Sequence, residues 1–116
     1  MTARGRPSDE LLREIAYGDL SGVGPLVNDP TRARKAAGLD QDSFQLAEIA
    51  ALAAVDAPPE SWSLHLTGQR TRIDVDRVLG TLIAITPIVG TPRVVSAAAN
   101  ILAATDLVEQ LDDESI

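Results

Sequence analysis

The chain has 116 residues, which is enough for one ordinary domain and too few for two. It contains no cysteine, and this excludes disulfides, thiolate metal sites and a cysteine nucleophile. Its formal net charge of −7 disfavours binding to nucleic acid phosphates or to anionic lipid headgroups, so we expect neither nucleic acid nor membrane as a partner.

Hydrophobic residues make up 45% of the chain but aromatic residues only 3%, and seventeen residues are alanine. Small aliphatic side chains in these proportions are typical of closely packed helices. We therefore predict an all-α fold, with one domain over residues 8–108 between a flexible arm at 1–7 and an acidic tail at 109–116. No apolar run is long enough to span a bilayer, and the polar N-terminus has no signal-peptide core, so we expect a soluble, cytoplasmic protein.

Two short helices are predicted in the first third of the chain. Ser8 is the expected N-cap of the first, which Gly18 ends. Asp29 is the expected N-cap of the second, with Pro30 at its first position and Gly38 after its last. Glycine and proline between them interrupt any longer element.

A strongly apolar helix follows, capped by Asp40 or Asp42. Residues 47–55 are apolar at every position except Glu48, which is too continuous for a helix with one face in water. We expect this helix to be buried nearly all round. The sequence Asp-Ala-Pro-Pro at 56–59 ends it.

The next helix begins at Pro59 and is predicted to reach about Arg70. Trp62 and Leu66 form its apolar row. Ser61 and His65, four residues apart, form a neighbouring polar row.

Two further apolar helices are predicted after Asp74, the expected N-cap of the first. Pro87 should kink or end that helix within residues 85–90. Thr91 is the expected N-cap of the last helix and Pro92 its first helical residue, and small residues continue this helix from Val94 to Asp106. The side of the first helix that we expect to be buried comprises Val78, Leu79, Leu82, Ile83 and Ile85.

Three almost uniformly apolar helices have more apolar surface than a single domain of this size can bury, since such a domain buries only about two-thirds of the surface of its chain. A second copy is the simplest source of cover for the rest. We therefore expect a homo-oligomer that associates through apolar helix faces.

The order of these features resembles the carboxymuconolactone decarboxylase family, which includes the alkylhydroperoxidase D proteins. The resemblance covers residues 38–106, and its most specific element is the P-x-x-G-x-P run at Pro87, Gly90 and Pro92. It implies an all-α, alkylhydroperoxidase D-like bundle whose helical hairpins assemble into a dimer, trimer or hexamer.

The redox branch of that family uses a CxxC pair and a glutamate placed at fixed distances before the histidine. Counting back from His65, those cysteines correspond to Pro58 and Ser61, and the glutamate corresponds to Leu46. Thiol peroxidase chemistry needs a thiolate, so this activity is excluded. Glu48 lies two positions from the expected acid, or about 200° around the helix, and we expect it to point away from the pocket of His65.

The lactone decarboxylase branch does not use cysteine, so the resemblance leaves this activity open. Such chemistry needs a proton donor and a cation that holds the substrate carboxylate. His65 is the candidate general acid/base, and Arg93 the candidate carboxylate ligand. We expect no cofactor, and no metal, because one histidine without cysteine leaves only carboxylates as ligands.

Each candidate also has an ordinary structural interpretation. Instead of belonging to a ligand site, His65 could be a hydrogen-bonded residue at a groove edge or a subunit interface. Trp62 could likewise be an anchor of the core or of an interface. Ser61 is a weak candidate nucleophile beside His65. Glu48 is either a catalytic acid of a pocket or an ordinary side chain, which lies on a narrow exposed strip of the helix or pairs with arginine across an interface. Arg93, in the first turn of a helix, needs an anionic partner, either a ligand or a side chain of a neighbouring subunit.

Two functions remain open on these grounds. The first is a non-redox family member that binds a small molecule or serves in assembly. The alternative is a cofactor-free lyase or isomerase, acting on a small carboxylate or lactone, with His65 as general acid/base. Because the reactive residues of the redox branch are replaced, the sequence favours the first.

Overall fold

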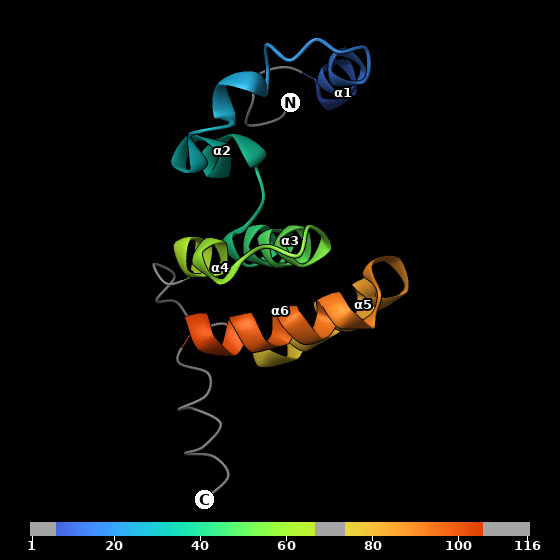
Figure 1. The fold of residues 1–116 in the computed structure, drawn as a ribbon. Helices are drawn as coiled ribbons and strands as arrows, with labels where there is room; N and C mark the ends of the chain where they lie inside the picture. The colour runs from blue at the N-terminus through green and yellow to red at the C-terminus, as the bar shows by residue number, and fades with distance from the viewer. Residues whose placement is uncertain (1–6, 67–73, 106–116) are drawn as a thin grey trace, which may run out of the picture. The chain divides into compact units, whose positions relative to one another are not determined.

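A computed structural model describes residues 7–66 and 74–105 (Figure 1). Within these ranges the chain forms six α-helices and one short 3₁₀ helix, and no strand, which confirms the all-α class. The chain divides into two compact units after residue 44. We describe them separately, as the N-terminal unit (7–44) and the C-terminal unit (45–66 and 74–105). The predicted helix end near Arg70, most of the N-terminal arm and the acidic tail lie outside the described residues.

The N-terminal unit contains α1 (Ser8–Ala16), the 3₁₀ helix η1 (Gly24–Leu26), α2 (Pro30–Ala37) and the first turn of α3 (Gln41–Ala54). The predicted cap of α2 is confirmed, because the Asp29 side chain accepts a hydrogen bond from the Arg32 backbone at 3.1 Å. Gly38 ends α2 in the left-handed conformation (φ 70°), as its sequence position indicates.

The other caps of this unit are partly as predicted. Asp40, rather than Asp42, caps α3, since its Oδ1 accepts a hydrogen bond from the Ser43 N–H at 2.7 Å. Ser8 is not an N-cap: it is the first helical residue of α1, and Pro7 occupies the cap position. The helix therefore begins one residue earlier than a Ser8 cap would place it, and Pro7 lies directly before its first residue.

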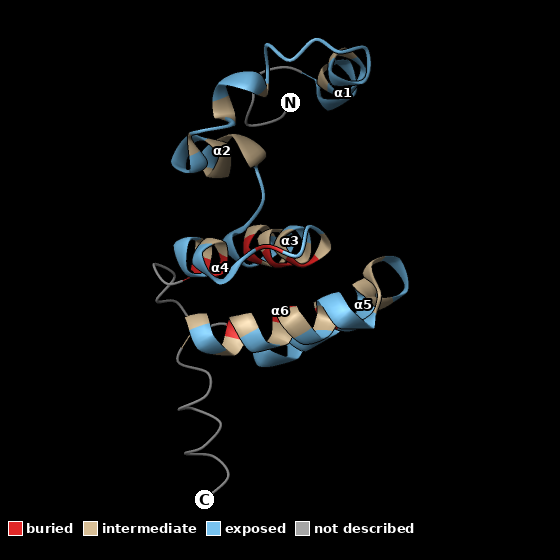
Figure 2. Cartoon of the chain, in the orientation of Figure 1, coloured by how far each residue is buried: buried red, intermediate tan, exposed pale blue. Residues whose placement is uncertain are grey.

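The N-terminal unit has no buried residue among those described, as Figure 2 shows. The segment between α1 and α2 is held by local bonds, including those from the Ser21 N–H and hydroxyl to Asp19 Oδ1, at 3.0 and 2.8 Å. Its order therefore comes from turns and caps rather than from a hydrophobic core.

The C-terminal unit has a core to which all four of its helices contribute. These are α3, α4 (Pro59–Leu66), α5 (Val75–Val89) and α6 (Thr91–Ala104), and α6 packs against both α4 and α5. Figure 1 shows the α3–α4 pair facing the α5–α6 pair. The buried apolar residues are Ile49, Ala53, Ala57, Trp62, Leu66, Val78, Leu82, Ala97 and Ile101.

The turn between α3 and α4 is a Schellman motif. Asp56 has a positive φ of 51°, its N–H bonds the Ala53 carbonyl at 3.1 Å, and the Ala57 N–H bonds the Leu52 carbonyl at 3.0 Å. The indole Nε1 of Trp62, which is 1% exposed, then donates to the Ala57 carbonyl at 3.1 Å. Together these bonds fix where α4 lies against α3.

Asp74 caps α5 as predicted, accepting hydrogen bonds from the Asp76 and Arg77 backbones at 3.0 and 3.3 Å. The helix runs through Pro87 and ends at Val89, within the predicted segment. Gly90, with φ 85°, occupies the cap position before α6, so the prediction of Thr91 as N-cap is wrong by one residue. The positive φ suits glycine, and this sharp turn precedes the helix.

Fewer residues are buried in the single chain than the apolar patterns predicted. Ala47 and Ala51 of α3 are exposed, so this helix is not buried all round. On α5, Leu79 and Ile83 are 55% and 62% exposed, whereas we expected them in the core; Val95 on α6 is 68% exposed. Apolar periodicity identifies the side of a helix that favours burial, but it does not identify the surface that packs against that side. No helix in the described ranges is long and apolar enough to cross a membrane.

Candidate functional site

His65 and Glu48 meet between α3 and α4. The Nδ1 atom of His65 lies 2.9 Å from Oε2 of Glu48, although the two residues are seventeen positions apart. The prediction that Glu48 points away from His65 is therefore wrong. The angle of about 200° relates Glu48 to the position of Leu46 on the same helix. The contact with His65 depends instead on where the Schellman turn places α4.

The roles of the two ring nitrogens of His65 depend on its tautomer. An ionised carboxylate only accepts hydrogen bonds, so with an ionised Glu48 the Nδ1–H of His65 donates to it, and Nε2 is the nitrogen that Glu48 does not engage. The side chain of His65 is 34% exposed, and that of Glu48 only 14%. The acid is thus largely shielded from water while the base stays accessible, an arrangement in which a carboxylate orients an imidazole.

Gln45 is a polar residue of this region that sequence reasoning missed. It lies one turn before Glu48 on α3 and is only 6% exposed. Its buried Nε2 has no hydrogen-bond partner in the structure. The signal was present in the sequence, because Gln45, Ile49 and Ala53 recur at four-residue spacing and share the buried side of α3.

Ser61 does not join the Glu48–His65 pair. Its side chain is half-buried in the first turn of α4, where its N–H bonds the Pro58 carbonyl at 3.0 Å. In the part of the chain that the structure describes, no hydrogen bond links Ser61 to His65. The arrangement therefore lacks the nucleophile–base contact that serine catalysis requires.

Trp62 lies in the core with its indole N–H bonded to Ala57, so its placement matches the core-anchor interpretation.

Arg93 has a partner that we did not anticipate. Its Nη1 donates to the carbonyl of Ala54 at 2.8 Å, in the last turn of α3. A guanidinium there offsets the negative end of the α3 dipole, so neither a ligand anion nor a subunit contact is needed to explain this arginine.

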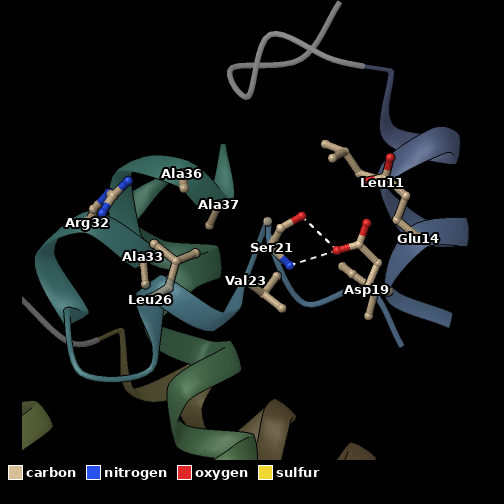
Figure 3. A pocket seen from close by; sticks show the side chains of 12 residues that line it. Leu11, Glu14, Asp19, Ser21, Val23, Leu26, Arg32, Ala33, Ala36 and Ala37 are labelled. Atoms are coloured by element: carbon tan, nitrogen blue, oxygen red, sulfur yellow. Dashed lines mark hydrogen bonds between the residues drawn. The ribbon is translucent and has the colours of Figure 1, made fainter. Parts of the chain in front are cut away.

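A separate hollow of about 590 Å³ lies in the N-terminal unit, and sequence reasoning missed it. Figure 3 shows Leu11 and Glu14 on its α1 side and Ala33, Ala36 and Ala37 on its α2 side. None of the candidate site residues lines it, and none of its lining residues is buried. No polar side chain that lines the hollow is shielded from water, whereas Glu48 of the Glu48–His65 pair largely is. The hollow is therefore the weaker candidate for a catalytic site.

Comparison with known proteins adds no assignment: no family model matches the chain, and neither the curated proteins nor the solved structures contain a match. Within residues 7–66 and 74–105, no group of three or more His, Asp or Glu side chains could hold a metal ion. The Glu48–His65 pair remains the arrangement with the clearest chemical capacity.

Proposed function

We propose that this chain is an acid–base enzyme, a cofactor-free lyase or isomerase of the carboxymuconolactone decarboxylase type that acts on a small carboxylate or lactone. The observation that carries the proposal is the 2.9 Å contact between His65 Nδ1 and Glu48 Oε2. A partly exposed base that is held by a largely shielded acid is the minimum equipment for moving a proton on a bound substrate.

The chemistry assigns one role to each member of the pair. When carbon dioxide leaves a β-oxo acid or a related lactone acid, its bonding electrons remain on carbon as an enolate. His65 in its doubly protonated form donates the Nε2 proton to that carbon, and solvent returns a proton to the ring. Glu48 stabilises the imidazolium that is present before the proton is donated, and it fixes the ring orientation, so Glu48 is a positioning residue.

This arrangement reverses the preference drawn from the sequence. The sequence favours a binding or assembly role because the reactive residues of the redox branch are replaced, whereas in the structure His65 has an acid, Glu48, beside it. Arg93 is not part of the proposal, because its guanidinium is engaged at the end of α3. The resemblance over residues 38–106 is to the family as a whole, and the lack of cysteine does not count against its lactone decarboxylase branch.

The test is a turnover screen of the full chain against carboxylated lactones and β-oxo acids, following carbon dioxide release and loss of substrate absorbance. We expect His65→Ala to lower kcat by about 10²–10⁴-fold, the usual contribution of general acid–base catalysis. Glu48→Gln should lower kcat with little change in KM. The matched control is Glu60→Gln, an exposed carboxylate in the first turn of α4, which should leave both constants unchanged.

A purely structural role for the pair predicts a different pattern. In that case His65→Ala would lower the melting temperature and leave any turnover at the parent rate when measured well below that temperature. Saturable binding of these acids without turnover of any of them would likewise contradict catalysis and would support the non-catalytic binding role.

A further inference from the structure

The outward side of α5 is apolar and open to solvent. Leu79, Gly80, Ile83, Ala84 and Pro87 follow one another at spacings of one, three or four residues and therefore share one side of the helix. All five are exposed, whereas Val78 and Leu82 on the opposite side are buried in the core. Ile88, beside this row, is 82% exposed.

A helix with one side in water normally presents charged or polar residues there, and a helix that is apolar all round is normally buried on all sides. Beyond Asp76 and Arg77 in its first turn, the outward side of α5 carries no charge. Its exposure in the single chain is therefore the signature of a surface that another apolar surface covers.

Charge argues for a second copy of this chain as the partner. The protein carries a net charge of −7, so two copies repel one another over most of their surface. Residues 78–105 contain one charged residue, Arg93, whose guanidinium bonds the end of α3. The outward side of α5 is thus a surface on which two copies can meet without opposing like charges.

Gly80 supplies an independent observation. Glycine inside a helix lowers helix stability relative to alanine. A Cβ at this position would meet nothing within 4 Å in the same chain, so internal packing does not require the glycine. Close approach of a second helix backbone does explain it, and Ala84 extends the same narrow surface by one turn.

We propose that α5 packs against α5 of a second copy across this side, with Gly80, Ile83 and Ala84 at the centre of an isologous contact. Two-fold symmetry places each Ile83 against the small residues of the partner helix, so the surface is complementary to itself. This contact is independent of the chemistry of Glu48 and His65.

The experiment measures the mass of the full chain in solution by light scattering at micromolar concentration, with far-ultraviolet circular dichroism as the check on folding. The parent chain should give at least twice the 12.2 kDa of one copy. Ile83→Asp places a charge in the contact and should reduce the mass. Gly80→Leu should do the same while keeping or raising helix stability, because leucine favours a helix over glycine and its Cβ meets nothing within 4 Å in the same chain.

The matched control is Leu64→Asp, which places the same charge at a leucine that is 79% exposed on α4. This variant should keep the parent mass. A parent chain that has the mass of one copy would overturn the proposal. So would an assembly that persists in folded Gly80→Leu and Ile83→Asp, or one that Leu64→Asp disrupts equally.

Discussion

Replacing Gln45 with methionine should stabilise the C-terminal unit. Gln45 is 6% exposed, and its buried Nε2 makes no hydrogen bond in the structure. Folding therefore removes a polar group from water without compensation. Methionine is also long and unbranched, so it fills the same space on the buried side of α3 without the amide.

The magnitude follows from the cost of the unpaired group. A buried, unsatisfied donor costs about 1–3 kcal/mol, and this is the gain expected in the free energy of unfolding for Gln45→Met. For a unit of this size, each kcal/mol corresponds to a rise of roughly 4–8 °C in melting temperature.

The assay is urea unfolding followed by the fluorescence of Trp62. This residue is the only tryptophan in the chain and is 1% exposed in the same core, so its emission reports unfolding of the C-terminal unit. The matched control is Gln41→Met, an exposed glutamine in the first turn of α3, which should give no gain. A Gln45→Met variant less stable than the parent would refute the reasoning, because the amide would then have a partner in solution.

Two further predictions concern the ends of helices. Asp74→Ala removes the side chain that accepts from the Asp76 and Arg77 backbones, and should cost about 1 kcal/mol in urea unfolding, whereas Asp74→Asn should retain most of the stability. Arg93→Met removes the bond to the Ala54 carbonyl, and should cost about 0.5–1.5 kcal/mol. If that cost is absent, the arginine does not hold the end of α3 in solution.

The local signals in the sequence predicted most helix ends. Asp29, Gly38 and Asp74 act where they were expected, because capping depends on a few neighbouring backbone groups. Ser8 and Thr91 were each placed one residue outside the helix that in fact includes them. An adjacent proline or glycine shifts a helix end by that amount.

The candidate site could not be predicted to the same degree. The position of Glu48 relative to His65 depends on the turn at Asp56 and on the bond from Trp62 to Ala57, which set the placement of α4. No periodicity within one helix contains that information. Leu79 and Ile83 were expected in the core but are exposed. Their apolar pattern predicts burial without distinguishing burial in the core from burial against another surface.

The absence of buried residues from the described N-terminal unit has a calorimetric consequence. The heat-capacity increment of unfolding arises mainly from apolar surface that becomes hydrated. Residues 7–44 have little such surface to release, so they add little to the increment or to a sharp heat-absorption peak. A thermogram of the whole chain is therefore dominated by the four-helix core, while the turns and caps before it loosen gradually over a broad range of temperature.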